Sequence, residues 1–135
     1  MVQHANTFGR DQRLKSTLVM DKAFSEGIKI KGHPVIARYT QSSFETECPF
    51  QVATTVSKRK FRKAVSRNRI KRLMRESWRL EKSRLLENWT PGDKKWGLVF
   101  IYVGREIPTF DECAHNIRQI VDVLLEHQIL EHEGK

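Results

Sequence analysis

Basic side chains crowd one stretch of this chain. Residues 58–75 contain ten Lys and Arg and no Asp or Glu. Arginine offers a planar fork of donors that fits phosphate oxygens. Asn68, which stands among the arginines, can donate to and accept from a base edge, a ribose hydroxyl or a metal-bound water. The whole chain has a net charge of +9, but the stretch 58–84 alone holds 13 basic and 2 acidic residues, so the remainder is weakly acidic. Such a localised charge indicates a nucleic acid or an anionic membrane as partner.

A helix is expected to carry this charge. The apolar spacing predicts a helix over 64–86, preceded by a loop over 58–63. Lys71, Arg75 and Arg79 follow one another four residues apart, where like charges repel and destabilise a free helix. An anionic partner removes that cost, whereas a merely solvated face usually mixes charges of both signs. The predicted core side holds Ile70, Leu73, Met74, Trp78 and Leu85. The opposite arc holds Asn68, Arg72, Arg75 and Arg79, with Lys71 and Lys82 beside it.

The rest of the sequence predicts one small α+β domain with helices packed on a sheet. The chain of 135 residues divides into a loose arm at 1–10, a single domain at 11–131 and a tail at 132–135. We expect a helix over 14–24, a turn or short edge segment over 29–34, a loop over 41–49, a turn over 88–95, and strands over 35–40, 50–57 and 97–103. Thr109 is expected to cap a final helix, with Glu112 completing a capping box. The core side of that helix is predicted to hold Phe110, Cys113, Ala114, Ile117, Ile120, Val121 and Leu124.

Several classes of protein are disfavoured. Two cysteines, Cys48 and Cys113, are too few for a disulfide framework or a four-cysteine zinc site, which fits a reducing cytoplasm. The longest apolar run, 98–103, is too short to span a bilayer, and the N-terminus lacks a signal region. The histidines and carboxylates show no convincing metal-ligand spacing, so we expect no metal site and no catalytic residue on the protein itself.

One segment resembles a known family. Val56-Ser57-Lys58, and then the run from Ala64 to Glu76 with Arg67-Asn68-Arg69 inside it, resemble the signature of the protein subunit of bacterial ribonuclease P. The similarity extends over about 10–130. It implies an α-β-β-β-α-β-α fold, a sandwich of a small sheet and helices with a left-handed crossover through the basic helix. It also implies a non-catalytic role in an endoribonuclease whose RNA subunit, with magnesium bound mainly by that RNA, removes the 5′ leader of precursor tRNA.

By this resemblance the protein binds both RNAs. The residues implied to bind RNA are Lys58, Arg59, Arg67, Asn68, Arg69, Lys71, Arg72 and Arg75; those implied to line a cleft for the leader are Met20, Phe24 and Tyr39. Met20 stands where the family usually has an aromatic residue, and the loop 60–63 looks one residue longer than usual. The sequence leaves open whether Arg38 or Tyr39 takes the aromatic position facing the cleft, because a register slip of one residue exchanges their faces.

Three other hypotheses about the function compete with the one that the resemblance implies. A structural RNA-binding protein of the ribosomal type, without a role in cleavage, shares the composition and the α+β class. A basic DNA-binding protein is the next alternative, although no helix-turn-helix or zipper pattern is evident. A membrane-surface helix ranks low, because the apolar side of the basic helix is needed for the core. No protein partner is evident, so the expected partners are ribonuclease P RNA and precursor tRNA.

Overall fold

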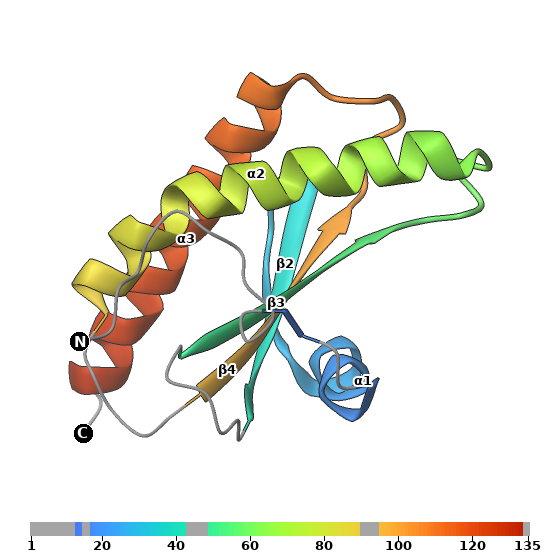
Figure 1. Ribbon diagram of the computed structural model, residues 1–135. Coiled ribbons are helices and arrows are strands. Elements are labelled where there is room, and N and C mark those ends of the chain that lie inside the picture. The colour runs from blue at the N-terminus through green and yellow to red at the C-terminus, as the bar shows by residue number, and fades with distance from the viewer. Residues whose placement is uncertain (1–12, 15–16, 43–48, 90–94, 134–135) are drawn as a thin grey trace.

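The architecture is a four-stranded sheet with helices on both faces (Figure 1). The computed structural model describes residues 13–14, 17–42, 49–89 and 95–133. The elements follow in the order α1 (Thr17–Glu26), β1 (Ile28–Ile30), β2 (Val35–Ser42), β3 (Phe50–Val56), α2 (Ala64–Asn88), β4 (Lys95–Tyr102) and α3 (Phe110–Glu133). The expected α+β class and element order are confirmed.

The sheet has the strand order β1-β2-β4-β3. Its neighbours are antiparallel except β3 and β4, which run parallel and are joined through α2. A parallel pair needs such a crossover, because a tight turn cannot return the chain to the start of the next strand. The basic helix is therefore the crossover that connects two neighbouring parallel strands.

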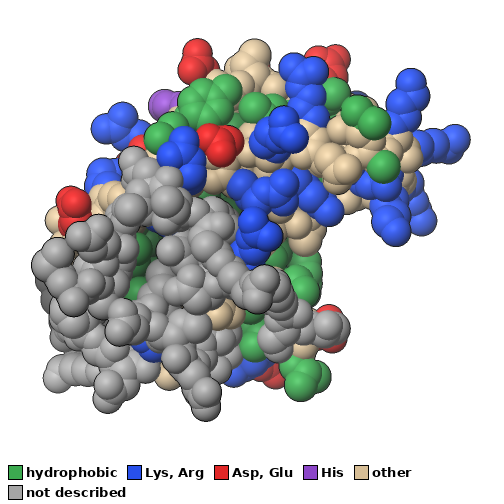
Figure 2. Space-filling view, in the orientation of Figure 1, with side chains coloured by type: hydrophobic (Ala, Val, Ile, Leu, Met, Phe, Trp, Pro, Cys, Tyr) green, Lys and Arg blue, Asp and Glu red, His purple; other side chains and the backbone are tan. Residues whose placement is uncertain are grey.

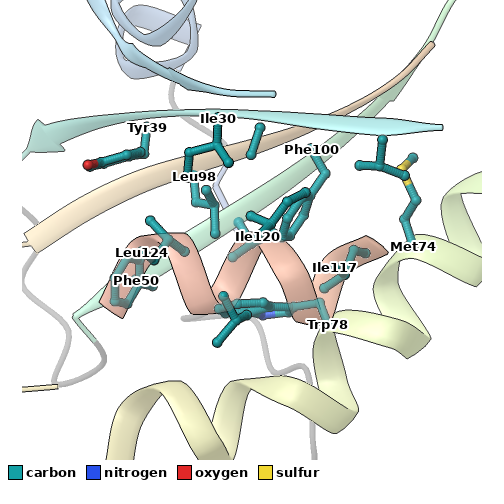
Figure 3. Packing of buried hydrophobic residues seen from close by; sticks show 14 of the residues in the cluster. Ile30, Tyr39, Phe50, Met74, Trp78, Leu98, Phe100, Ile117, Ile120 and Leu124 are labelled. Atoms are coloured by element: carbon teal, nitrogen blue, oxygen red, sulfur yellow. The ribbon is translucent and has the colours of Figure 1, made fainter. Parts of the chain in front are cut away.

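One face of the sheet, here called the core face, packs against α2 and α3. Phe50, Leu98 and Phe100 point from the strands toward Trp78 of α2 and Ile120 of α3 (Figure 3). Alternate strand residues point to opposite sides of a sheet, so Val99 and Ala53 point away from this core. They pack instead with Ala23 and its neighbours under α1. We call this second side the α1 face.

The first helix starts three residues later than predicted. Leu14 is buried, but the segment containing it pairs with β3: Arg13 forms a bridge with Val52, and the Leu14 amide donates to the Val52 carbonyl at 2.9 Å. The apolar spacing that suggested a helix from residue 14 thus reflects burial at the edge of the sheet. In α1 itself, Val19 approaches the sheet closely, since a Cβ on Gly97 would lie 2.6 Å from Val19 Cγ1.

Two predictions about helix faces are wrong in part. Lys82, placed beside the polar arc of α2, is only 1% exposed, because α2 packs against α3 as well as against the sheet. Phe110, expected in the core, is the first residue of α3 and is 37% exposed. Thr109 caps α3 as expected: its Oγ1 accepts from the Glu112 amide at 3.2 Å and donates to the Glu112 carboxylate at 3.2 Å.

Candidate nucleic-acid interface

The residues expected to bind RNA lie on α2 and on the loop before it. Lys58, Arg59, Asn68, Arg69 and Arg72 are exposed, whereas Arg67, Lys71 and Arg75 are half-buried. We call these eight residues the basic surface. Figure 2 shows Lys and Arg side chains gathered around the N-terminal end of α2 and along its length. The fold thus places a charge that is dense in sequence onto one exposed side of a long helix.

A compact turn presents the first two of these residues. Ser57 Oγ accepts from the amides of Arg59 and Lys60, at 3.2 and 3.4 Å, and Phe61 is buried against the ring of Tyr102, with centroids 5.8 Å apart. Lys60 does not project freely, because its Nζ donates to the Val103 carbonyl at 3.2 Å. The loop 60–63 is therefore tied to the end of the sheet, and Lys58 and Arg59 remain exposed.

Arg67 has a structural bond besides its expected contact role. Its Nη1 donates to the carbonyls of Phe61 and Arg62, at 2.8 and 2.9 Å. The N-cap residue Lys63 makes no side-chain capping bond, and the first turn of α2 contains no acidic residue. Arg67 therefore supports the loop that leads into α2, and a substitution there disturbs the shape of the basic surface as well as its charge.

A further arginine extends the basic surface toward the sheet. Arg13 is held next to β3 by its bridge to Val52. Burial lowers the pKa of the Arg75 guanidinium, and the positive charges of Arg13 and Arg72 lower it further. Three guanidinium groups thus repel one another, a cost that a bound phosphate removes. The sequence alone does not reveal the place of Arg13, because its pairing with β3 is a long-range contact with no local signal.

The ion pairs lie away from the densest charge. In the part of the chain that the structure describes, the salt bridges join Arg79 to Glu76 at 3.0 Å and Arg84 to Glu81 and Asp122 at 2.9 and 2.7 Å. Burial opposes a rise in the pKa of Arg84, but hydrogen bonds to Asp122 and Glu81 outweigh it and raise that pKa. The C-terminal half of α2 is therefore partly neutralised, and the uncompensated charge lies in its N-terminal half.

The residues expected at the leader cleft do not share one face. Phe24 is 42% exposed on α1, and Met20 is half-buried against the Leu14, Ala23 and Val99 cluster. Tyr39, by contrast, is 4% exposed on the core face.

The core contacts of Tyr39 fix its side. Its hydroxyl hydrogen bonds to His127 Nδ1 at 2.5 Å, and its ring meets Trp96 edge-on at 5.6 Å. The structure therefore does not bring Tyr39 together with Phe24.

Arg38 takes the α1 face in place of Tyr39. It lies opposite Val99 in the antiparallel register, and its Nη1 donates to the Phe24 carbonyl at 2.9 Å. The register between β2 and β4 thus places Arg38 on the α1 face and Tyr39 on the core face. In Figure 2 the molecule is hollowed between the N-terminal end of α2 and the part of the surface below it.

The described residues contain neither a cluster of metal-binding side chains nor a membrane-spanning helix. Across residues 13–14, 17–42, 49–89 and 95–133, no group of three or more His, Cys, Asp or Glu side chains is arranged to hold a metal ion. No helix within the same residues has the length and apolar character needed to cross a membrane. The basic surface itself offers guanidinium, ammonium and amide groups, all of which can donate hydrogen bonds to an anion.

Comparison with known proteins places these features in a family. The ribonuclease P family model matches residues 8–124. The ribonuclease P protein component of Chlorobaculum tepidum is 32% identical over 136 aligned positions, covering 94% of this chain and 88% of that protein. The one from Porphyromonas gingivalis is 32% identical over 106 positions, covering 77% of each.

Solved structures agree in fold. The ribonuclease P protein of Staphylococcus aureus matches with a TM-score of 0.64 at 18% identity, covering 84% of this chain and 94% of that one. The ribonuclease P protein of Thermotoga maritima matches with a TM-score of 0.62 at 18% identity, covering 81% and 94%. With its sequence relatives, its fold and its basic helix in agreement, the chain belongs to the ribonuclease P protein family.

Proposed function

We propose that this chain is the protein component of a bacterial ribonuclease P and that its basic surface binds the RNA subunit. The observation that carries the proposal is the position of that surface: a stretch without acidic residues forms a tight loop and the exposed side of α2. Phosphate contacts give most of the affinity for nucleic acid, and guanidinium groups make them in pairs of hydrogen bonds. Its place of action is then the bacterial cytoplasm.

In this proposal the RNA subunit, with its magnesium ions, cleaves the precursor tRNA, and the protein assists by binding. Two polyanions must approach each other in the complex, and each positive charge near their contact lowers the repulsion between them. The protein should therefore lower the magnesium concentration that the RNA subunit needs. Asn68, exposed among the arginines, has the donor and acceptor needed for a base edge or a magnesium-bound water.

The α1 face is the proposed contact for the 5′ leader. A single-stranded RNA binds best where aromatic rings for its bases lie beside positive charge for its backbone. Phe24 supplies the exposed ring and Met20 an adaptable apolar neighbour. Tyr39 has no part in this contact, because its ring and hydroxyl are engaged in the core.

Reconstitution tests the proposal directly. The protein is mixed with a bacterial ribonuclease P RNA and a precursor tRNA at a magnesium concentration too low for the RNA alone. Lanes with only protein or only RNA are the controls. We expect cleavage at the mature 5′ end only when both are present.

The other outcomes have distinct meanings. Tight binding of the RNA subunit without enhanced cleavage would support a structural RNA-binding protein instead. Cleavage by the protein alone would overturn the assignment of the chemistry to RNA.

Replacing Arg72 and Arg75 together by Ala should weaken binding of the RNA subunit while the urea midpoint of unfolding stays nearly unchanged, because neither residue belongs to the hydrophobic core.

A further inference from the structure

We propose that Arg38 binds a phosphate of the leader and also positions α1, so that this chain holds the leader by charge at a place where stacking would be expected. The inference rests on the proposed function of the α1 face, and it concerns the chemistry by which that face recognises RNA.

Arg38 lies on the α1 face of the sheet. Arg38 lies in β2, opposite Val99 of β4 on one side and Lys29 of β1 on the other. Directly opposite residues in antiparallel strands point to the same face. Arg38 and the exposed Lys29 therefore both lie on the α1 face, where they add positive charge beside the apolar side chains under α1.

Arg38 also donates a hydrogen bond to the C-terminal end of α1. The Phe24 carbonyl that accepts from Arg38 Nη1 is in the last turn of α1, where carbonyls lack partners within the helix. That turn contains no basic residue of its own. Since a cation at a helix C-terminus is favoured by the helix dipole, Arg38 supplies from the sheet the charge that this last turn lacks. This bond fixes the turn from which Phe24 projects.

The guanidinium of Arg38 has more N–H donors than its bond to α1 uses. A guanidinium has five N–H donors, and the bond to Phe24 uses one of them. Arg38 is half-buried and takes no part in the salt bridges of the described residues. Its other donors are therefore left for an anion that approaches the last turn of α1, the turn that also carries the exposed Phe24.

The neighbouring surface indicates what kind of ligand fits. Ile36, Thr55 and Ile101 form a row across the α1 face, and all three are half-buried. A ligand on this face meets the guanidinium of Arg38 and a short, largely apolar row, beside the helix that carries the exposed Phe24. Single-stranded RNA has both matching parts, bases that stack on rings and a phosphate backbone that pairs with arginine.

The test compares the leader-dependent affinity of holoenzymes made with wild-type protein, Arg38→Gln and Arg38→Lys. Affinity is measured at several salt concentrations for a precursor tRNA with a long leader and for mature tRNA, and the ratio isolates the leader contribution. Arg38→Gln keeps a hydrogen-bond donor but removes the charge. We expect it to reduce the leader contribution about tenfold. We also expect its slope in log salt to become shallower by about 0.7, the value for one phosphate on a single strand.

Two further variants separate phosphate binding from helix positioning. Arg38→Lys keeps the charge, so it should keep the salt slope and restore part of the affinity. Lys22→Gln is the matched control, because Lys22 also joins α1 to β2, through a bond from its Nζ to the Gln41 carbonyl at 3.4 Å. It makes the same change of charge at a bond of the same kind and should leave the leader contribution unchanged. Urea unfolding of each protein checks that all variants are folded.

The outcomes distinguish this inference from the proposed function. If the wild-type holoenzyme shows no leader contribution, the α1 face is not a leader contact and both proposals fall. If the wild-type holoenzyme shows a leader contribution but Arg38→Gln changes neither that contribution nor its salt slope, the α1 face remains the leader contact and the role proposed for Arg38 is wrong. Equal losses in Arg38→Gln and Arg38→Lys with an unchanged salt slope would reduce Arg38 to a structural residue and overturn the phosphate contact.

Discussion

Arg13 shows how a single residue completes a charged surface from a distant part of the chain. Its bridge to β3 brings it close enough to Arg75 to lower the pKa of that guanidinium. This repulsion destabilises the free protein, and a phosphate bound between the groups outweighs it because it attracts both of them. Burial of Arg75 adds to the cost in the free protein.

We therefore expect Arg13→Gln to weaken binding of the RNA subunit about three- to tenfold and to make the salt slope shallower by up to about 0.9, the value for one phosphate of a duplex. The free energy of unfolding should stay the same or rise slightly, because a repulsion is removed. Salt titrations of RNA binding and urea unfolding measure the two effects. Arg105→Gln, an exposed charge in the loop after β4, is the matched control. Equal losses in both variants would show that only net charge matters.

Asn68 gives a prediction in which function and stability change in opposite directions. It lies exposed in α2, where Ala is intrinsically more favourable than Asn by about 0.5 kcal/mol. Asn68→Ala should therefore stabilise the protein slightly and still raise the magnesium concentration needed for cleavage, because its amide is lost from the RNA contact. Thermal unfolding and a magnesium titration of the holoenzyme give the two readouts. An unchanged magnesium titration would remove Asn68 from the interface.

At the scale of elements, the contact between α1 and the sheet depends on a missing side chain. A Cβ on Gly97 would lie 2.6 Å from Val19 Cγ1 and 3.4 Å from the Leu14 side chain. Gly97→Ala should therefore force α1 away from β4 and destabilise the fold by about 1–3 kcal/mol, the usual cost of overpacking. Urea unfolding measures the loss.

The double variant Val19→Ala with Gly97→Ala supplies the control for that substitution. If the clash is the cause, removing the Val19 methyl groups should recover part of the stability lost in Gly97→Ala, and the two changes should not be additive. Additive losses of stability would mean that Gly97 is needed for the conformation of β4 rather than for the packing of α1 against it.

The order and type of the elements could be predicted from sequence because their signals are local. The alternation in β3, the apolar run of β4 and the Thr109 cap of α3 each occupy a few consecutive residues, and each is found close to where it was expected. What failed depends on distant neighbours. Leu14 is buried by pairing with β3, Lys82 by the packing of α3 on α2, and the faces of Arg38 and Tyr39 are set by the register with β4.

The candidate site divides in the same way. The basic surface could be read from residue types and helical spacing, since its members lie within one loop and one helix. Arg13 and Arg38 could not, because each acquires its place through a contact with another element: Arg13 through Val52, Arg38 through Phe24. Local patterns therefore predict the position of the basic surface better than they predict the residues of the proposed leader contact.

At the scale of the whole molecule, the two proposed contacts belong to opposite sides of one sheet. The core face is closed by α2 and α3, and the outer side of α2 carries the basic surface. The other face is covered by α1 only in part, since Ile36 and Ile101 stay half-buried. Arg13 pairs with the edge strand β3, and its charge is close enough to Arg75 to contribute to the lowered pKa of that guanidinium. Positive charge thus continues around the edge of the sheet, which suits an RNA complex that contacts both sides.

The closed core gives a prediction for the stability of the whole molecule at high pH. Burial raises the pKa of the Cys113 thiol from 9.0 to about 11, and the nearby charge of Glu112 adds to the rise. Between these two values the unfolded chain has lost the thiol proton and the folded protein keeps it, so rising pH favours unfolding. The contribution of this proton is complete below pH 9 and is lost by about pH 11, at roughly 1.4 kcal/mol per unit.

Cys113→Ala isolates this effect from the titration of the many lysines. At pH 8 the variant should be less stable than the wild type, because Cys113 is fully buried and its sulfur leaves a small cavity. As the pH rises from 8 to 11, that difference should shrink by about 2 kcal/mol, since only the wild type loses the contribution of the thiol proton. Urea unfolding of both proteins at each pH measures it. A difference that stays constant would mean that the thiol ionises equally easily in the folded and unfolded chains. The first turn of α3, where Cys113 lies, would then open to water well below the pH at which the rest of the core unfolds.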